Sequence, residues 1–209
     1  MRTNRKRTTR TLGLAGAVTA AALLLAACGN DDTMSGMDHG GATASATASG
    51  PSSVAPSAAG SFNDADVMFA QMMIPHHEQA LEMAKLADGR AEDDGIKKIV
   101  AAVEKAQDPE IQKMKAWLKG WGKPESAGMG HAMAGMMSEQ DMKNLAAVKG
   151  KDFDRTFAEL MIAHHEGAVE MAKDEQKNGA NAEAKALADE VVRAQTAEIT
   201  ELRTILDRL

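Results

Sequence analysis

The sequence contains one segment twice, and this repeat limits the folds that the chain can adopt. Residues 73–85 read MIPHHEQALEMAK and residues 161–173 read MIAHHEGAVEMAK; the two are identical at ten of thirteen positions and lie 88 residues apart. The repeated unit covers about 62–121 and 152–209, which is long enough for two secondary-structure elements. The same spacing relates these further pairs without a gap: Phe69 and Phe157, Gln107 and Gln195, Glu110 and Glu198, Ile111 and Ile199, and Leu118 and Leu206.

Each repeat has the periodicity of two helices. Apolar residues recur every three or four positions, and no stretch alternates with the period of two that is typical of a strand. Residues that end helices occur at 88–89, 120–135, 150 and 178–179, and a short additional helix is predicted from Glu139 to Val148. Two helical hairpins that each leave an apolar face uncovered are best closed against each other. The sequence therefore predicts an all-α fold, a four-helix bundle built from two repeated helical hairpins.

Pro75 lies inside the first helical pattern. Proline removes a backbone hydrogen bond from a helix, so we expect a kink or a break near residues 71–74. The second repeat has Ala163 at this position, and any kink is therefore local geometry that the two repeats do not share.

The paired histidines lie on the apolar face of their helices. At about 100° per residue, Met73 falls within about 60° of His76 and about 40° of His77, so a thioether and two imidazoles share one face. The carboxylates of the same helices point elsewhere: Glu78 lies about 200° from His76, and Glu82 about 120°. The second repeat has the same arrangement. A di-iron bundle needs a Glu-x-x-His motif with inward carboxylates, and neither pair of histidines has one.

Imidazole and thioether ligands together are typical of a soft metal ion, Cu(I) or its mimic Ag(I). The chain has fifteen methionines against four phenylalanines and two tryptophans. The alternative is that methionines only pack and histidines only form hydrogen bonds in the core. Four buried imidazoles would then need four sets of hydrogen-bond partners, which favours metal binding. The predicted ligands in the bundle are Met73, His76, His77, Met83, Met161, His164, His165 and Met171.

The amides of Gln107 and Gln195 lie in the apolar stripes of the second and fourth long helices. A buried amide needs hydrogen-bond partners, and a histidine ring nitrogen is one candidate. The backbone or water is the alternative.

The connection between the repeats, residues 122–138, is rich in methionine and histidine. It contains little apolar bulk besides its methionines, so packing explains them poorly. We interpret the segment as a mobile strand of soft-metal ligands. The predicted ligands here are Met129, His131, Met133, Met136 and Met137.

The N-terminal part of the chain has the features of a lipoprotein leader. Basic residues in the first ten positions precede an apolar run that is too short to span a bilayer, and the run ends in Leu25-Ala26-Ala27-Cys28. We predict a signal peptide at 1–27 and lipidation at Cys28. Residues 28–61 are rich in Gly, Ala, Ser and Pro, which predicts a flexible tether. The tether carries a smaller set of soft ligands, Met34, Met37 and His39.

The motifs resemble the domain of unknown function 305 family, also called CopM-like. The resemblance covers residues 62–209 and rests on the doubled HHE-x-A-x-E-M-A string and on Q-x-x-E-I at 107–111 and 195–199. It implies a ferritin-like four-helix bundle and an extracytoplasmic copper binder, linked to copper tolerance, that uses methionine and histidine.

The sequence and the resemblance together predict a lipid-anchored, extracytoplasmic protein that sequesters or transfers Cu(I) and is not an enzyme. The expected partners are the membrane, through the lipid anchor, and a copper exporter or another copper carrier. The formal net charge of −6 and the few aromatic residues argue against a nucleic-acid partner. Two alternatives stay open: a ferritin-like redox protein that cycles a metal, and a structural or adaptor bundle without metal.

Overall fold

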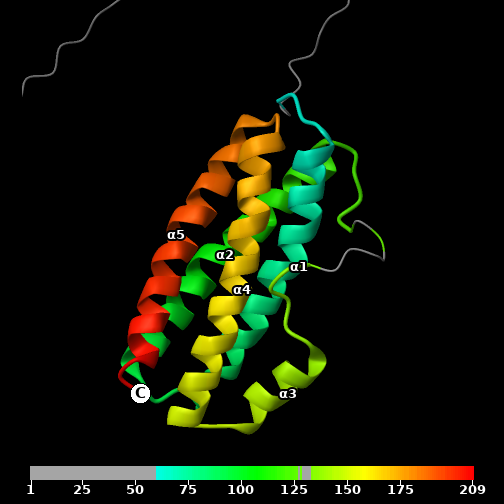
Figure 1. Ribbon diagram of the computed structural model, residues 1–209. Helices are drawn as coiled ribbons and strands as arrows, with labels where there is room; N and C mark the ends of the chain where they lie inside the picture. Colours follow the sequence, from blue (N-terminus) through cyan, green and yellow to red (C-terminus); the bar gives the residue numbers. More distant parts are fainter. Residues whose placement is uncertain (1–59, 127, 129–132) are drawn as a thin grey trace, which may run out of the picture. The chain divides into compact units, whose positions relative to one another are not determined.

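The computed structural model describes residues 60–126, 128 and 133–209. The helices are α1 (Asp64–Leu86), α2 (Asp94–Gly120), α3 (Glu139–Ala147), α4 (Lys151–Asn178) and α5 (Ala182–Leu206). The predicted all-α four-helix bundle is confirmed: α1 and α2 form one hairpin, α4 and α5 form the other, and the four long helices lie together (Figure 1). The short helix α3 also lies where the sequence predicts it. The predicted signal peptide, Cys28 and nearly all of the predicted tether lie outside the described residues.

Side chains with oxygen acceptors fix the start of most helices. Asn63 accepts hydrogen bonds from the backbone N–H groups of Ala65 and Asp66 at the start of α1. Asp93 caps α2 and Asn181 caps α5 in the same way. These caps satisfy N–H groups that have no partner inside the helix.

Of the predicted kink or break at Pro75, the break is wrong, because α1 continues through this residue. Proline costs a helix interior about 3 kcal/mol. Here Ile74 and His76 on either side are buried in the bundle, and this packing holds the turn in helical form. Pro109 likewise lies inside α2.

The apolar core consists of two clusters. One contains Phe69, Ile74 and Leu118, and the other contains Phe153 and Phe157. Along α1, the first cluster ends at Ile74 and the second begins at Ala80; along α4, the second ends at Met161 and the first resumes at Ala168. The repeated histidine pairs lie in the interval between the clusters on both helices.

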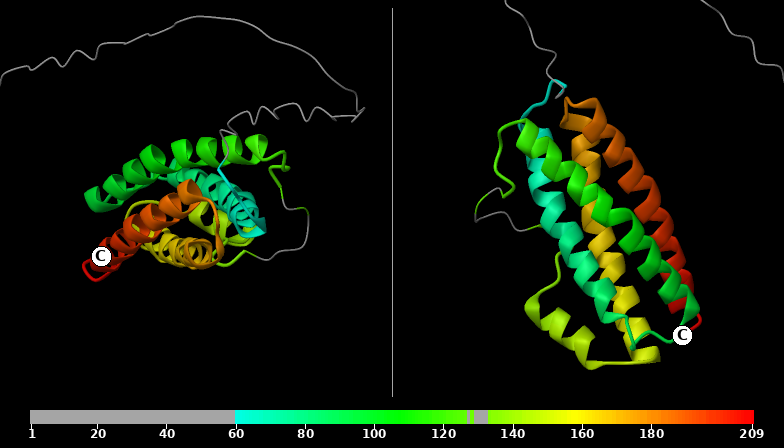
Figure 2. Two further views of the ribbon diagram at one scale, coloured as in Figure 1. Left: turned by 90° about the horizontal axis from the view of Figure 1, so that it is seen from above. Right: turned by 180° about the vertical axis from the view of Figure 1, so that it is seen from behind.

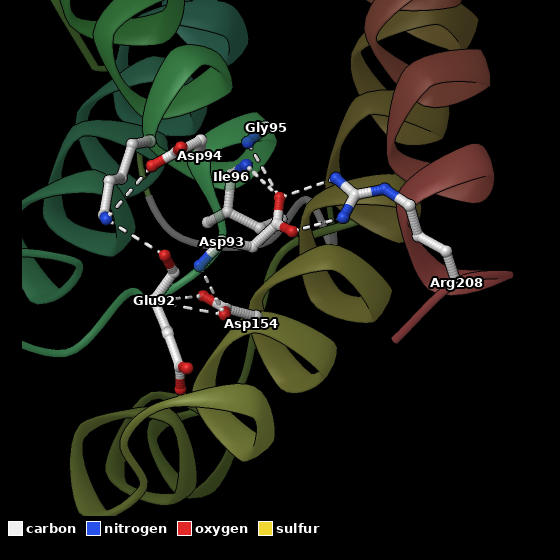
Figure 3. A network of polar contacts seen from close by, with 8 residues as sticks. Glu92, Asp93, Asp94, Gly95, Ile96, Asp154 and Arg208 are labelled. Atoms are coloured by element: carbon white, nitrogen blue, oxygen red, sulfur yellow. Dashed lines mark hydrogen bonds and ion pairs between the residues drawn. The ribbon is translucent and has the colours of Figure 1, made fainter.

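The two hairpins are joined by a reciprocal pair of aspartates. Asp66 in α1 accepts hydrogen bonds from the backbone N–H groups of Ala180 and Asn181 in the α4–α5 turn. Asp154 in α4 accepts from the N–H groups of Glu92 and Asp93 in the α1–α2 turn (Figure 3). Each aspartate is fully buried, and each completes the turn of the opposite hairpin.

Helix α3 covers one end of the groove between α1 and α4 (Figure 2). Its Leu145 is fully buried in the second cluster, and Met142 packs against that cluster. None of the helices in the described ranges is both long and apolar enough to cross a membrane.

Candidate metal centre

His76 and His164 meet at the interface of α1 and α4. Their ring centroids are 3.7 Å apart with an angle of 39° between the ring planes, and both side chains are fully buried. The two residues occupy the same position in the two repeats, so the pseudo-twofold arrangement of the hairpins brings these imidazoles together.

Most of the ring nitrogens of this pair have no protein partner. His76 Nε2 donates to the carbonyl oxygen of Ala134 at 3.3 Å, which leaves its Nδ1 unprotonated. That Nδ1 atom and both ring nitrogens of His164 have no hydrogen-bond partner among the residues that the structure describes. A buried nitrogen lone pair without a hydrogen bond is unfavourable unless another group, such as a metal ion, occupies it.

Both imidazoles are neutral at physiological pH. Burial, with the nearby His77, lowers the pKa of His76 from its ordinary 6.5 to about 3. Burial and the adjacent His76 lower the pKa of His164 far below its ordinary value. Metal ions bind the neutral form of imidazole, so the site is in the ligand-competent form without any proton release.

The second histidine of each pair turns toward the other helix of its own hairpin. His77 Nε2 donates to Glu110 on α2 at 2.7 Å, and His165 Nε2 donates to Glu198 on α5 at 2.7 Å. Both imidazoles are buried, and their Nδ1 atoms have no hydrogen-bond partner in the described part of the chain. A histidine that binds a metal through one nitrogen commonly donates from the other to a carboxylate. In both pairs, Nε2 donates to a carboxylate, which leaves Nδ1 as the nitrogen that could bind a metal.

The sequence correctly placed the carboxylates of the histidine helices outside, since Glu78, Glu82, Glu166 and Glu170 are all exposed. It missed the role of Glu110 and Glu198, which come from the other two helices. The signal was available, because both residues belong to the repeated Q-x-x-E-I string.

The predicted methionine ligands of the bundle divide into two groups. Met73, Met83 and Met161 are fully buried. Met73 precedes the first histidine pair by about one helical turn, and Met161 precedes the second in the same way. Met171 is half-buried and lies against the first core cluster. Within the described ranges, no three His, Cys, Asp or Glu side chains are placed to hold one metal ion. A centre here would combine imidazoles with thioethers.

The last part of the connection between the repeats lies directly over this centre. Gly135 has a φ of 77°, and a Cβ atom on it would lie 2.6 Å from the carbonyl oxygen of Ala163. A Cβ atom on Gly167 would lie 2.1 Å from the carbonyl oxygen of Ala134. Two glycines thus let the backbone of the connection touch the backbone of α4 beside His164.

The side chain of Gln79 fastens the same segment to α1. Its amide nitrogen donates to the carbonyl oxygen of Met137 at 2.9 Å, and its oxygen accepts from the N–H of Met137 at 2.8 Å. Gln79 and Gly167 are equivalent positions of the repeat. The two repeats therefore differ at this position, where the connection crosses them. Gln79 holds the connection by hydrogen bonds, and Gly167 leaves room for the close approach of its backbone.

The expectation that packing does not explain the connection is corrected for its described part. Met133, Met136 and Met137 are half-buried, and Met137 packs against the second core cluster because Gln79 holds its backbone there. Their role as metal ligands stays a prediction. Met129, His131, Met34, Met37 and His39 lie outside the described residues.

The two repeated glutamines face each other across a small cavity between α2 and α5. The cavity has a volume of about 20 Å³ and is also lined by Glu110 and Glu198. Gln107 and Gln195 are buried, and no described group donates to the side-chain oxygen of either. The suggested bond to a histidine nitrogen does not form. A cavity of this size holds about one water molecule, which is the other partner that the sequence allowed.

A family model described as "Domain of unknown function (DUF305)" matches residues 66–206. The chain belongs to this family. The resemblance seen in the doubled HHE string is thereby confirmed. No curated protein matches the sequence.

Solved DUF305 structures share the fold over most of their length. A putative secreted DUF305 protein from Streptomyces coelicolor is 31% identical, with a TM-score of 0.66, and the match covers 69% of this chain and 93% of that one. A DUF305 fragment from Deinococcus radiodurans is 31% identical with a TM-score of 0.64, covering 70% and 98%. CopM in its Cu(I)-bound form is 33% identical with a TM-score of 0.61, covering 68% and 96%. CopM structures with Cu(II) and with Ag are also similar to this chain.

Proposed function

We propose that this protein binds Cu(I) at the buried histidines between α1 and α4 and sequesters it or passes it on. The observation that carries the proposal is the pair His76 and His164. These two neutral, buried imidazoles are in van der Waals contact, and three of their four ring nitrogens have no hydrogen-bond partner among the described residues. Similarity to CopM, which has been solved with Cu(I), Cu(II) and Ag, supports a metal of this class.

The donor set favours a soft, singly charged ion. Imidazole nitrogens and thioether sulfurs are soft donors, which Cu(I) and Ag(I) prefer and hard divalent ions do not. Glu110 and Glu198 hold the outer imidazoles in orientation through Nε2 and leave Nδ1 as the donor atom. Met73 is the buried thioether nearest in sequence to the first histidine pair, and Met161 is the nearest to the second.

The methionines of the connection complete the proposal. Residues 133–137 cover the histidine pair, so an ion that reaches it from this side passes the connection. We propose that Met129, His131, Met133, Met136 and Met137 collect the ion and deliver it to the centre, without catalysing a reaction. Lipidation of Cys28, an extracytoplasmic location on the membrane, and exchange with a copper exporter or another carrier belong to the same proposal.

The test uses the full chain, with His76→Gln and His164→Gln variants, melted with and without Ag(I). An ion present at 100 times its dissociation constant stabilises the native state by about 2.7 kcal/mol. We expect each variant to lose the part of the Ag(I) stabilisation that the histidine centre supplies, while its metal-free melting stays close to that of the wild type. Unchanged stabilisation by Ag(I) in both variants would remove the central site. Stabilisation by Fe(II) with none by Ag(I) would favour the ferritin-like redox alternative.

A further inference from the structure

A pocket opens between α1 and α4 at the end of their groove that α3 does not cover. Its volume is about 270 Å³, and its wall is formed by the N-terminal half of α1 and the C-terminal half of α4, which lie side by side (Figure 1). Three methionines line it: Met68, Met72 and Met171. The pocket therefore presents soft ligands at a place reached from solvent.

The three thioethers come from facing helices. Met68 and Met72 are one helical turn apart on α1 and so share a face, and Met171 faces them from α4. Met68 is 47% exposed, so its thioether is accessible to an ion from solvent. Met72 and Met171 are half-buried.

A buried carboxyl group, that of Glu175, lies in the same wall as the methionines. Glu175 is only 1% exposed, and neither of its side-chain oxygens has a hydrogen-bond partner among the described residues. Its side chain fits because residue 179 is glycine, where a Cβ atom would lie 2.1 Å from Glu175 Oε1. Burial, with the nearby Asp66, raises the pKa of Glu175 from its ordinary 4.5 to about 8, so this wall carries a neutral carboxyl group at pH 7 and the thioethers are the ligands that the pocket offers.

The duplication of the hairpin does not explain Met68, Met72 or Glu175, although Met171 corresponds to the buried Met83. The positions equivalent to Met68, Met72 and Glu175 are Thr156, Leu160 and Ala87. At the corresponding end of the groove, α3 and Met137 lie against α1 instead. The methionines and the buried carboxyl group therefore occur together only in the end of the groove that is open.

We propose that Met68, Met72 and Met171 form a second soft-metal site, for Cu(I) or Ag(I), separate from the histidine centre. This second site rests on the proposed function for the kind of metal, but neither His76 nor His164 is among its ligands. An ion in this pocket is exposed to solvent on one side, whereas an ion at the histidine pair is enclosed. The pocket therefore allows fast exchange of the ion with solvent, whereas the histidine centre retains its ion.

The first experiment counts Ag(I) ions on the full chain by native mass spectrometry. The variants are a Met68→Leu, Met72→Leu, Met171→Leu triple and the His76→Gln, His164→Gln double. Leucine replaces methionine at little cost in packing, usually below about 1.5 kcal/mol. Met142→Leu is the control, since Met142 is also half-buried but lies on α3 at the covered end of the groove.

We expect the triple variant to bind one Ag(I) fewer than the wild type and the Met142→Leu control to bind the same number. An unchanged count in the triple variant, with a lower count in the histidine double variant, would overturn this proposal and leave the proposed function intact. The reverse result would support the pocket and remove the histidine centre. A wild type that binds no Ag(I) would overturn both.

A second measurement does not depend on the fold of a variant. The methionine ε-methyl signals of the wild type can be followed by NMR during addition of Ag(I). We expect the signals of Met68, Met72 and Met171 to shift together over the same equivalent. Signals that stay in place to saturation would overturn the site. The single Met68→Leu change, at an exposed position, should weaken binding at the pocket at least tenfold.

Discussion

The imidazole rings of His76 and His164 lie with their centroids 3.7 Å apart, each from the same position of a repeated hairpin. Neither is charged in this environment, because burial lowers both pKa values. A pair of this kind is a poor choice for stability alone, since apolar side chains of similar size would fill the space without unpaired nitrogens.

Replacing His164 with leucine should stabilise the metal-free protein and abolish binding at the centre. Neither ring nitrogen of His164 has a partner in the described part of the chain, so their loss removes a desolvation cost of about 1 kcal/mol or more. Urea denaturation at pH 7.5 measures the change. His165→Leu is the matched control: it breaks the hydrogen bond to Glu198 and should destabilise by about 1 to 3 kcal/mol. A loss of stability in His164→Leu as large as that of the control would mean that His164 has a structural role.

Glu110 and Glu198 should affect metal affinity although they contact the metal only through histidine. Removal of an outer carboxylate that orients a ligating histidine typically weakens binding 10- to 100-fold. We expect Glu110→Ala and Glu198→Ala to weaken Ag(I) binding to a similar extent, measured by competition titration. Glu82→Ala, at an exposed position of α1, serves as the control. Equal affinities in all three variants would remove the outer imidazoles from the centre.

Gly167→Ala should detach the connection from α4. The new Cβ atom would lie 2.1 Å from the backbone oxygen of Ala134, and backbone on both sides leaves little room for adjustment. We expect a loss of about 1 to 3 kcal/mol in stability. Amide hydrogen exchange should also become faster at Met137, whose N–H is bound by Gln79. Gly120→Ala, which meets nothing within 4 Å, should show neither change.

Glu175 should make the protein less stable in alkaline solution. Burial, with the nearby Asp66, raises the pKa of Glu175 from its ordinary 4.5 to about 8. The folded state therefore holds this proton more tightly than the unfolded state, and stability falls as the pH rises from about 4.5 to about 8. The slope for one such group is at most about 1.4 kcal/mol per pH unit.

Glu175→Gln should remove this slope, so the difference in unfolding free energy between variant and wild type should grow from pH 5 to pH 8 and then level off. Taking the difference cancels the contribution of the histidines, which both proteins share. Glu170→Gln, on the exposed side of α4, should show a constant difference. A constant difference for Glu175→Gln would mean that its carboxyl group is already ionised in this range.

The architecture could be predicted from the sequence because apolar periodicity is visible within each helix and the repeat shows that the same hairpin occurs twice. The helix ends at Leu86, Gly120 and Asn178 follow from glycine and asparagine near those positions. The path of the connection could not be predicted. It depends on the hydrogen bonds of Gln79 and on the missing side chain of Gly167, and both residues lie far from Ala134 and Met137 in the chain. The pairing of His77 with Glu110 was missed for a similar reason: it requires the register between two helices, which periodicity within one helix does not determine.

The reciprocal aspartates have a consequence for how the molecule can be divided. Asp66 closes the turn of the second hairpin and Asp154 closes the turn of the first, so each hairpin carries a cap that the other one needs. If the backbone were cut within residues 122–132, the two halves should stay associated as a heterodimer, and separately produced halves should recover the bundle on mixing. A single hairpin that carried both an Asp66-like residue and an α1–α2-like turn could satisfy its own copy across a twofold axis. The present chain has the internal symmetry of such a homodimer, because one polypeptide contains both hairpins.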